Sequence, residues 1–335
     1  MTVQAMENTA PPGKTMSRDA VLDLVRGVAI ILVVLGHVLV GIRSAGADTV
    51  LVRFLLIVIY STHMALFFEV SGILSRGMAQ RSWPEVGRQL GLRVVWPYIL
   101  WSIVLLAAHF AMSGSTNTSL DTFAPWRILW SPPSVMWFLY VLFFAMLIMR
   151  ALQPVSRTVM IGVAIALMAM AYGFDFVPQE GRWIGVFLIA AAVGRAGLER
   201  ISTPVGYGLA GVVMLVTMWI AWTEAQGGLT GYPAGTVRYI PALVAGPLVL
   251  VWLCRRLPPE GWIAAALSFV GRYTMPIFVT HILVTAGTRI VLLQVLGIGN
   301  WTIIVIAGTL LGVCLPLVAA TLADRVGVAR LLGWR

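Results

Sequence analysis

The chain has 335 residues, of which 59% are hydrophobic and only 11% are charged, and its mean hydropathy is +0.92. Soluble domains are about one-quarter charged, so this composition excludes one or two water-soluble domains of that length. The net charge of +10 does not indicate a nucleic-acid partner, because 22 of the 23 basic residues are arginines gathered in short segments between apolar stretches, the pattern of topology signals in multispanning proteins. We therefore expect an all-α polytopic integral membrane protein whose apolar surface contacts the lipid bilayer.

The amino-terminal segment 1–17 is rich in proline and glycine for its length and has no apolar run, so we predict a disordered cytoplasmic tail. We expect 18–335 to form a single transmembrane domain. The first apolar run could alternatively be a secretory signal peptide followed by a small-residue cleavage site. It is longer than the usual apolar core of a signal peptide and carries Asp23, Arg26 and His37, which favours a retained helix.

Apolar runs of the length needed to cross a hydrocarbon core of about 30 Å recur along the chain and predict about ten transmembrane helices. They lie at 22–42, 54–74, 92–112, 135–152, 159–174, 183–196, 207–223, 239–253, 267–293 and 301–323. With both termini in the cytoplasm, the 23 basic residues divide into 17 on the cytoplasmic side and 6 on the outer side. This bias predicts a multi-pass protein of the inner (cytoplasmic) membrane with both termini inside.

The first predicted helix carries three ionisable residues, and such residues inside a span mark functional sites by default. Asp23 and Arg26 are three positions apart, so they share a face and can pair. Arg26 and His37 are eleven positions apart, which at about 100° per residue brings them back to the same face, about 16 Å along the axis. One face therefore holds a cation at the inner boundary and an imidazole deep in the membrane.

Two other predicted helices carry histidines at a comparable depth: His63, followed by Glu69 and Ser71, and His281. A structural hydrogen-bonding role and a substrate contact are both open for His63 and His281. A zinc site would use imidazole ligands, but no two histidines are four positions apart and no carboxylate lies beside His37. We therefore expect no metal.

Five ordered segments together resemble the membrane acyltransferase 3 family, which includes O-acetylases of cell-surface sugars. They are Arg26 and His37 with ten intervening residues, the Phe-Phe-x-x-Ser-Gly motif within 63–72, the arginines and Pro-Tyr of 88–101, Trp-Phe-Leu at 137–139, and 271–281 ending in histidine. The resemblance implies a ten-helix enzyme that takes an acyl group from cytoplasmic acyl-CoA, most simply acetyl-CoA, and passes it to a hydroxyl at or across the membrane. The sequence departs from the family at Glu69, where relatives carry an apolar or aromatic residue, so the role of Glu69 is open.

The resemblance implies that His37 is the catalytic residue and that Arg26, Arg88 and Arg93 bind the CoA phosphates. We expect Asp23 to support Arg26. The expected contacts to the acceptor, a sugar-containing or other hydroxyl compound, are His63, Glu69, Ser71, Trp137 and His281. His37 would act either as general base or as transient acyl acceptor.

The alternative is a secondary transporter or exporter of a sugar or glycolipid, in which intramembrane ionisable groups bind substrate or relay protons. Transporters often contain two related halves, and the sequence shows no internal repeat. The acyltransferase is therefore the favoured interpretation.

Overall fold

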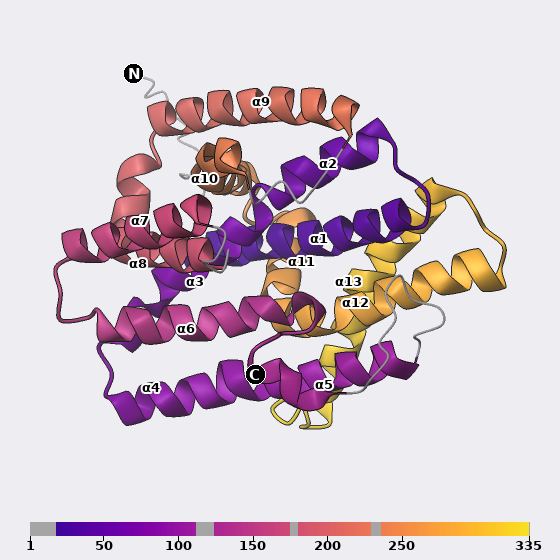
Figure 1. Cartoon of the computed structure of the whole chain (residues 1–335), viewed down its shortest axis with the longest axis horizontal. Helices are drawn as coiled ribbons and strands as arrows, with labels where there is room; N and C mark the ends of the chain where they lie inside the picture. The colour runs from indigo at the N-terminus through magenta and orange to yellow at the C-terminus, as the bar shows by residue number, and fades with distance from the viewer. Residues whose placement is uncertain (1–17, 112–123, 175–179, 229–235, 335) are drawn as a thin grey trace, which may run out of the picture.

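The computed structural model of the chain describes residues 18–111, 124–174, 180–228 and 236–334, and the predicted tail 1–17 lies outside these residues (Figure 1). The described part is helical and contains no strand. Its helices are α1 (Arg18–Ser44), α2 (Val50–Tyr60), α3 (His63–Ala79), α4 (Trp83–Leu90), α5 (Trp96–Ala111), α6 (Trp137–Ala151), α7 (Arg157–Gly173), α8 (Gly181–Ile201), α9 (Pro204–Gly227), α10 (Ile240–Arg256), α11 (Trp262–Arg272), α12 (Thr274–Ile290) and α13 (Trp301–Arg325).

Eight helical stretches among the described residues are long and apolar enough to cross a membrane. This finding confirms the predicted all-α, polytopic class. The other two predicted spans coincide with α7, which has 17 residues, and with α8, which is kinked at Gly194 where φ is 62°. The count of ten and the cytoplasmic position of both termini therefore stay predictions.

The predicted span 54–74 is two helices, because the chain bends at Ser61 and Thr62 between α2 and α3. Side chains at the bend satisfy carbonyls that the end of α2 leaves free. The Thr62 hydroxyl donates to the carbonyls of Val58 and Ile59 at 3.1 and 3.2 Å, and the Ser61 hydroxyl donates to the carbonyl of Val58 at 2.9 Å. The bend therefore costs few hydrogen bonds, although it falls within an apolar run.

The predicted span 267–293 is also interrupted, since α11 ends at Arg272 and α12 begins at Thr274. Pro276 lies in the first turn of α12, where its missing N–H is tolerated, but its ring would clash with the carbonyl of residue 272 in a continuous helix. The interruption lets α11 pack closely on α1. A Cβ at Gly271 would collide with the carbonyl of Asp23, and one at Gly27 with the carbonyl of Leu267.

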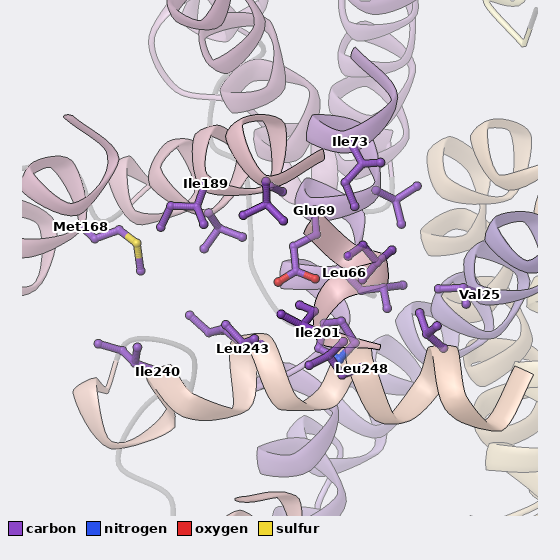
Figure 2. Close-up of a pocket in the computed structure, with 18 of the residues that line it drawn as sticks. Val25, Leu66, Glu69, Ile73, Met168, Ile189, Ile201, Ile240, Leu243 and Leu248 are labelled. Atoms are coloured by element: carbon purple, nitrogen blue, oxygen red, sulfur yellow. The ribbon is translucent and has the colours of Figure 1, made fainter. Parts of the chain in front are cut away.

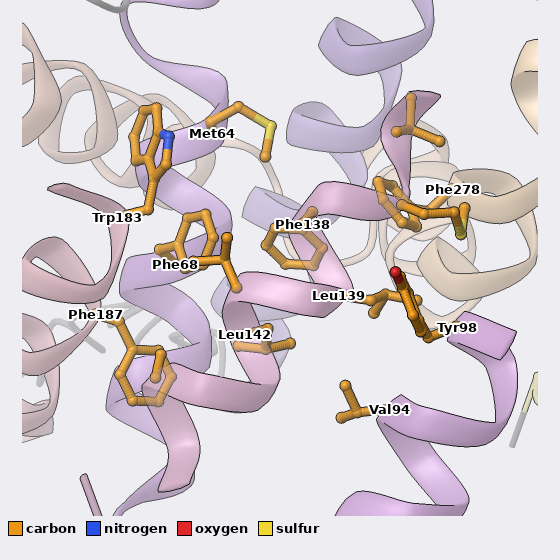
Figure 3. Close-up of a cluster of buried hydrophobic side chains, with 14 of the residues drawn as sticks. Met64, Phe68, Val94, Tyr98, Phe138, Leu139, Leu142, Trp183, Phe187 and Phe278 are labelled. Carbon is orange, nitrogen blue, oxygen red and sulfur yellow. The ribbon is translucent and has the colours of Figure 1, made fainter. Parts of the chain in front are cut away.

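Helix α1 lies near the centre of the bundle and packs against α2, α3 and α10 to α13 (Figure 1). Beside it, α3 packs on α8, and α8 packs in turn on α7 and α6. The largest buried cluster includes aromatic rings between α3, α6 and α8, where Phe68 stacks on Trp183 at 5.6 Å and meets Phe138 edge-on at 4.9 Å (Figure 3). This rigid core fixes the positions of α1, α3 and α12, which carry the histidines.

Candidate functional site

Three histidines from three helices converge in the interior of the bundle. The ring centroids of His37 on α1 and His281 on α12 are 5.1 Å apart. Tyr60, the last residue of α2, lies between His37 and His63, with centroid distances of 6.3 and 4.9 Å. The side chains of His63 and His281 are buried, and His37 is half-buried.

Backbone carbonyls fix the tautomers of two of these histidines. Nδ1 of His63 donates to the carbonyl of Ile59 at 2.6 Å, and Nδ1 of His281 donates to the carbonyls of Ile277 and Phe278 at 3.0 and 2.7 Å. A carbonyl only accepts hydrogen bonds, so in each ring Nδ1 carries the proton and, in the neutral ring, Nε2 is an acceptor. Nε2 of His281 is buried and has no hydrogen-bond partner among the described residues.

The cationic end of the site is also formed between α1 and α12. Arg26 lies 3.7 Å from Asp23, as their spacing predicts, and donates to the hydroxyl of Thr274 at 3.4 Å. Thr274, which pairs with Arg26, and His281, which lies beside His37, are seven positions apart on α12. Arg26 and His37 are eleven positions apart on α1. Both α1 residues therefore face α12, which agrees with the face predicted from their spacing.

A cavity of about 380 Å³ lies beside the cationic end of the site, and none of the three histidines is among the residues that line it. Its polar lining comprises Arg26, Arg93, Ser71 and Thr274. Its apolar lining includes Val33, Met64 and Phe278, which lie four, one and three residues from His37, His63 and His281 respectively. The cavity thus extends from the cationic end to residues within four positions of each histidine, and we call it the donor cavity.

Three residues predicted for the same site lie elsewhere. Arg88 is exposed on α4 and does not line the donor cavity. Glu69 lines a different cavity on another side of α3. Trp137 packs against Trp183 at 6.1 Å, within the aromatic core.

Two residues of the site were not predicted from the sequence. Thr274 follows the break before α12, which apolar composition does not reveal. Trp334 lines the donor cavity from the carboxyl-terminal segment, stacked on Trp101 at 5.9 Å. The segment is held by α5, where the indoles of Trp96 and Trp101 donate to the carbonyls of Leu331 and Leu332 at 2.8 and 2.9 Å. Nε1 of Trp334 is buried without a partner in the described part of the chain.

Within the described ranges, no group of three or more His, Cys, Asp or Glu side chains is arranged to hold a metal ion. The carbonyl-bound Nδ1 atoms leave His63 and His281 one ring nitrogen each for any further interaction.

Comparison with known protein families assigns the chain to one of them. The family profile described as an acyltransferase domain, Acyl_transf_3, matches residues 19–321, from α1 into α13. The chain belongs to the acyltransferase 3 family. The matched range of this acyltransferase 3 protein includes every predicted site residue, whereas Trp334 lies beyond it.

Two curated relatives share part of the acyltransferase 3 domain. "Nodulation protein NolL" of Mesorhizobium japonicum is 26% identical over 166 residues, which are 48% of this chain and 43% of the relative. "Nodulation protein NolL" of Sinorhizobium fredii is 31% identical over 172 residues, which are 48% of this chain and 45% of the relative. The match therefore spans less than half of either relative. No solved structure matches the chain at a significant level.

Proposed function

We propose that the protein is an O-acyltransferase of the inner membrane. It moves an acyl group, most simply acetyl, from cytoplasmic acyl-CoA to a hydroxyl of a sugar or glycoside at or across the membrane. The observation that carries this proposal is the donor cavity, since its lining includes Arg26 and Arg93 together with Val33, Met64 and Phe278, each of which is within four residues of one of the three histidines. Family membership supports the same class of reaction.

The distribution of polar and apolar residues along the cavity suits a nucleotide thioester. Its phosphates cannot enter hydrocarbon, so they belong with the arginines at the boundary, where guanidinium groups bind phosphate through paired N–H donors. The arm that carries the thioester is long, narrow and uncharged. On α1, Arg26 and His37 are eleven residues apart, which corresponds to about 16 Å along the helix. The apolar lining between them excludes the water that would hydrolyse the thioester.

His37 is the proposed reacting base. It makes no hydrogen bond to another described residue, so none of those residues holds its ring nitrogens. In the direct route, His37 takes the proton of the acceptor hydroxyl while the oxygen attacks the thioester carbon. The carbon–sulfur bond then breaks, and the CoA thiolate leaves and receives the proton from His37. If the acyl group passes first to His37, the carbon–sulfur bond breaks in that step and the CoA thiolate leaves. In the second step the acceptor oxygen takes the acyl group from His37, and the hydroxyl proton passes to the thiolate, which restores the neutral imidazole.

His281 is proposed to orient His37. In the structure Nε2 of His281 has no partner among the described residues. With Nδ1–H held by two carbonyls, this nitrogen accepts a hydrogen bond from one nitrogen of His37, whose ring centroid is 5.1 Å away, when His37 turns toward it with substrate bound. The other nitrogen of His37 is then free to act as the base. His63 instead holds the bend between α2 and α3 through its bond to the carbonyl of Ile59.

The proposal is tested with purified protein in nanodiscs, acetyl-CoA and a glycan extract from the source cells, by release of the CoA thiol and by an acetyl mass gain on the glycans. We expect His37→Ala to abolish transfer while the protein still inserts and folds. Arg26→Gln should mainly raise the donor KM. Arg127→Gln, which changes an arginine outside the donor cavity, should leave that KM unchanged. Normal transfer by His37→Ala would refute the proposal, and transport without CoA release would favour an exporter.

A further inference from the structure

A second cavity, of about 550 Å³, lies on another side of α3 from the donor cavity (Figure 2). Glu69 and Ile73 of α3 line this cavity, whereas Ser71 and Leu74 line the donor cavity, and Val70 touches both. Its other walls come from α1, α7, α8 and α10 and are almost wholly aliphatic. Nothing in the proposed acyl transfer uses this space.

The carboxyl group of Glu69 projects into the second cavity, toward α10 (Figure 2). It makes no hydrogen bond or ion pair with any residue that the structure describes. Carboxyl groups at this depth are costly, and they usually pair with another group or mark the path of a ligand. The unpaired carboxyl therefore indicates a ligand that brings its own hydrogen-bonding group.

The shape and opening of the second cavity indicate a lipid-like ligand. Along α10 the lining residues run from Ile240 to Val251, about 16 Å of helix, which is close to half of a hydrocarbon core of about 30 Å. Ile165 of α7 and Val244 of α10 also line the cavity, and they are 56% and 54% exposed on the apolar outside of the bundle. A hydrocarbon chain can thus enter from the bilayer without crossing water.

The depth of Glu69 restricts the polar group of this ligand. Glu69 is six residues from Ser75, the end of its candidate span, which places it about 9 Å inside along the helix. A phospholipid keeps its charged headgroup at the membrane surface, and a charged amine is costly to bring to this depth. A neutral hydroxyl is a far smaller polar group to desolvate, and it can donate a hydrogen bond to the carboxyl.

We propose that the second cavity binds the chain of a long, neutral lipid alcohol, with its hydroxyl hydrogen-bonded to Glu69. This inference does not depend on the proposed acyl transfer. It assigns to Glu69 a ligand of its own, separate from the acyl donor.

The test is photolabelling of the full chain in nanodiscs with two probes of equal length, a diazirine-bearing hexadecan-1-ol and the corresponding diazirine-bearing hexadecane. We expect the alcohol to label peptides of α3 and α10 several-fold more than the hydrocarbon. Unlabelled hexadecan-1-ol should compete, and unlabelled hexadecane should not. Equal labelling by the two probes in the wild-type protein would overturn the proposal.

Three variants complete the test. Glu69→Leu should abolish the preference for the alcohol, and Glu85→Gln, which removes a carboxylate on the surface helix α4, should keep it. Ala190→Phe places a ring in the second cavity without altering Glu69, so it should lower labelling by both probes if Glu69→Leu does not fold. A preference that survives Glu69→Leu, or labelling unchanged in Ala190→Phe, would refute the assignment.

Discussion

Replacing His281 with leucine should separate stability from activity. Nε2 of His281 is a buried acceptor without a partner among the described residues, a condition that costs folding free energy. His281→Leu removes this atom. It also removes the bond from Nδ1 to the carbonyls of Ile277 and Phe278, but both carbonyls remain within the hydrogen-bonded turns of α12.

The expected magnitude follows from these two changes. Removing an unpaired buried acceptor should stabilise the fold by about 1–3 kcal/mol, and loss of the Nδ1 bond should cost about 0.5–1.5 kcal/mol. The variant should therefore lie between about 0.5 kcal/mol less stable and about 2.5 kcal/mol more stable than the wild type, whereas most core substitutions destabilise by more. Turnover should fall by roughly 10²-fold, the lower end of the range for general acid–base catalysis, because His37 loses its orienting partner.

Thermal unfolding in detergent and acetyl transfer from acetyl-CoA, measured on the same preparation, provide the assay. Ile277→Ala, at a fully buried neighbour, is the control and should lower stability by about 2–5 kcal/mol. The reasoning is refuted if His281→Leu is destabilised as much as Ile277→Ala, because Nε2 of His281 would then have a partner even without substrate. It is refuted equally if His281→Leu keeps wild-type turnover.

Three further predictions test packing, the donor cavity and a surface ion-pair cluster. Gly271→Ala should lower stability by about 1–3 kcal/mol, because two backbones must separate to admit the methyl group. In the same unfolding assay Gly77→Ala, which meets open space, should match or exceed the wild type. Trp334→Ala should raise the donor KM more than it changes kcat, because Trp334 lines the donor cavity. The control Trp262→Ala, at a side chain that is 80% exposed, should leave that KM unaltered. Equal shifts of KM in the two variants would argue against the cavity assignment. Two neighbouring arginines hold the pKa of Asp48 below its usual value, so its contribution to stability is present above the unfolded pKa of about 3.9 and is lost as pH falls through the lowered folded pKa. Asp48→Asn should thus cost less than about 1 kcal/mol at neutral pH, and a Tm difference that persists in strong acid would point to another cause.

The helical period was enough to predict the most important geometry of the site. Spacings of three and eleven residues placed Asp23, Arg26 and His37 on one face, and the structure turns that face toward α12. The same period separates Glu69 from Ser71 by about 200° around the helix. Both were nevertheless predicted to contact the acceptor, because they are close in the sequence. The structure assigns them to two cavities.

The breaks within the predicted spans could not be read from hydropathy. At Thr62 the interruption depends on short-range hydroxyl bonds to carbonyls, and at Tyr273 on a proline three residues later, while the residues around both are apolar. The position of Trp334 could not be predicted from the sequence for another reason, because only tertiary packing brings it to the donor cavity. No local pattern links a terminal indole to the start of α5.

The donor cavity draws on both ends of the chain, because Arg26 and Trp334 line it from positions about 300 residues apart. Contacts of such sequence separation form late, after the intervening helices have been synthesised and have found their places. A partly synthesised chain would therefore hold Arg26 and His37 in the membrane with one wall of the cavity still missing. The cavity would be completed only when synthesis has passed Trp334.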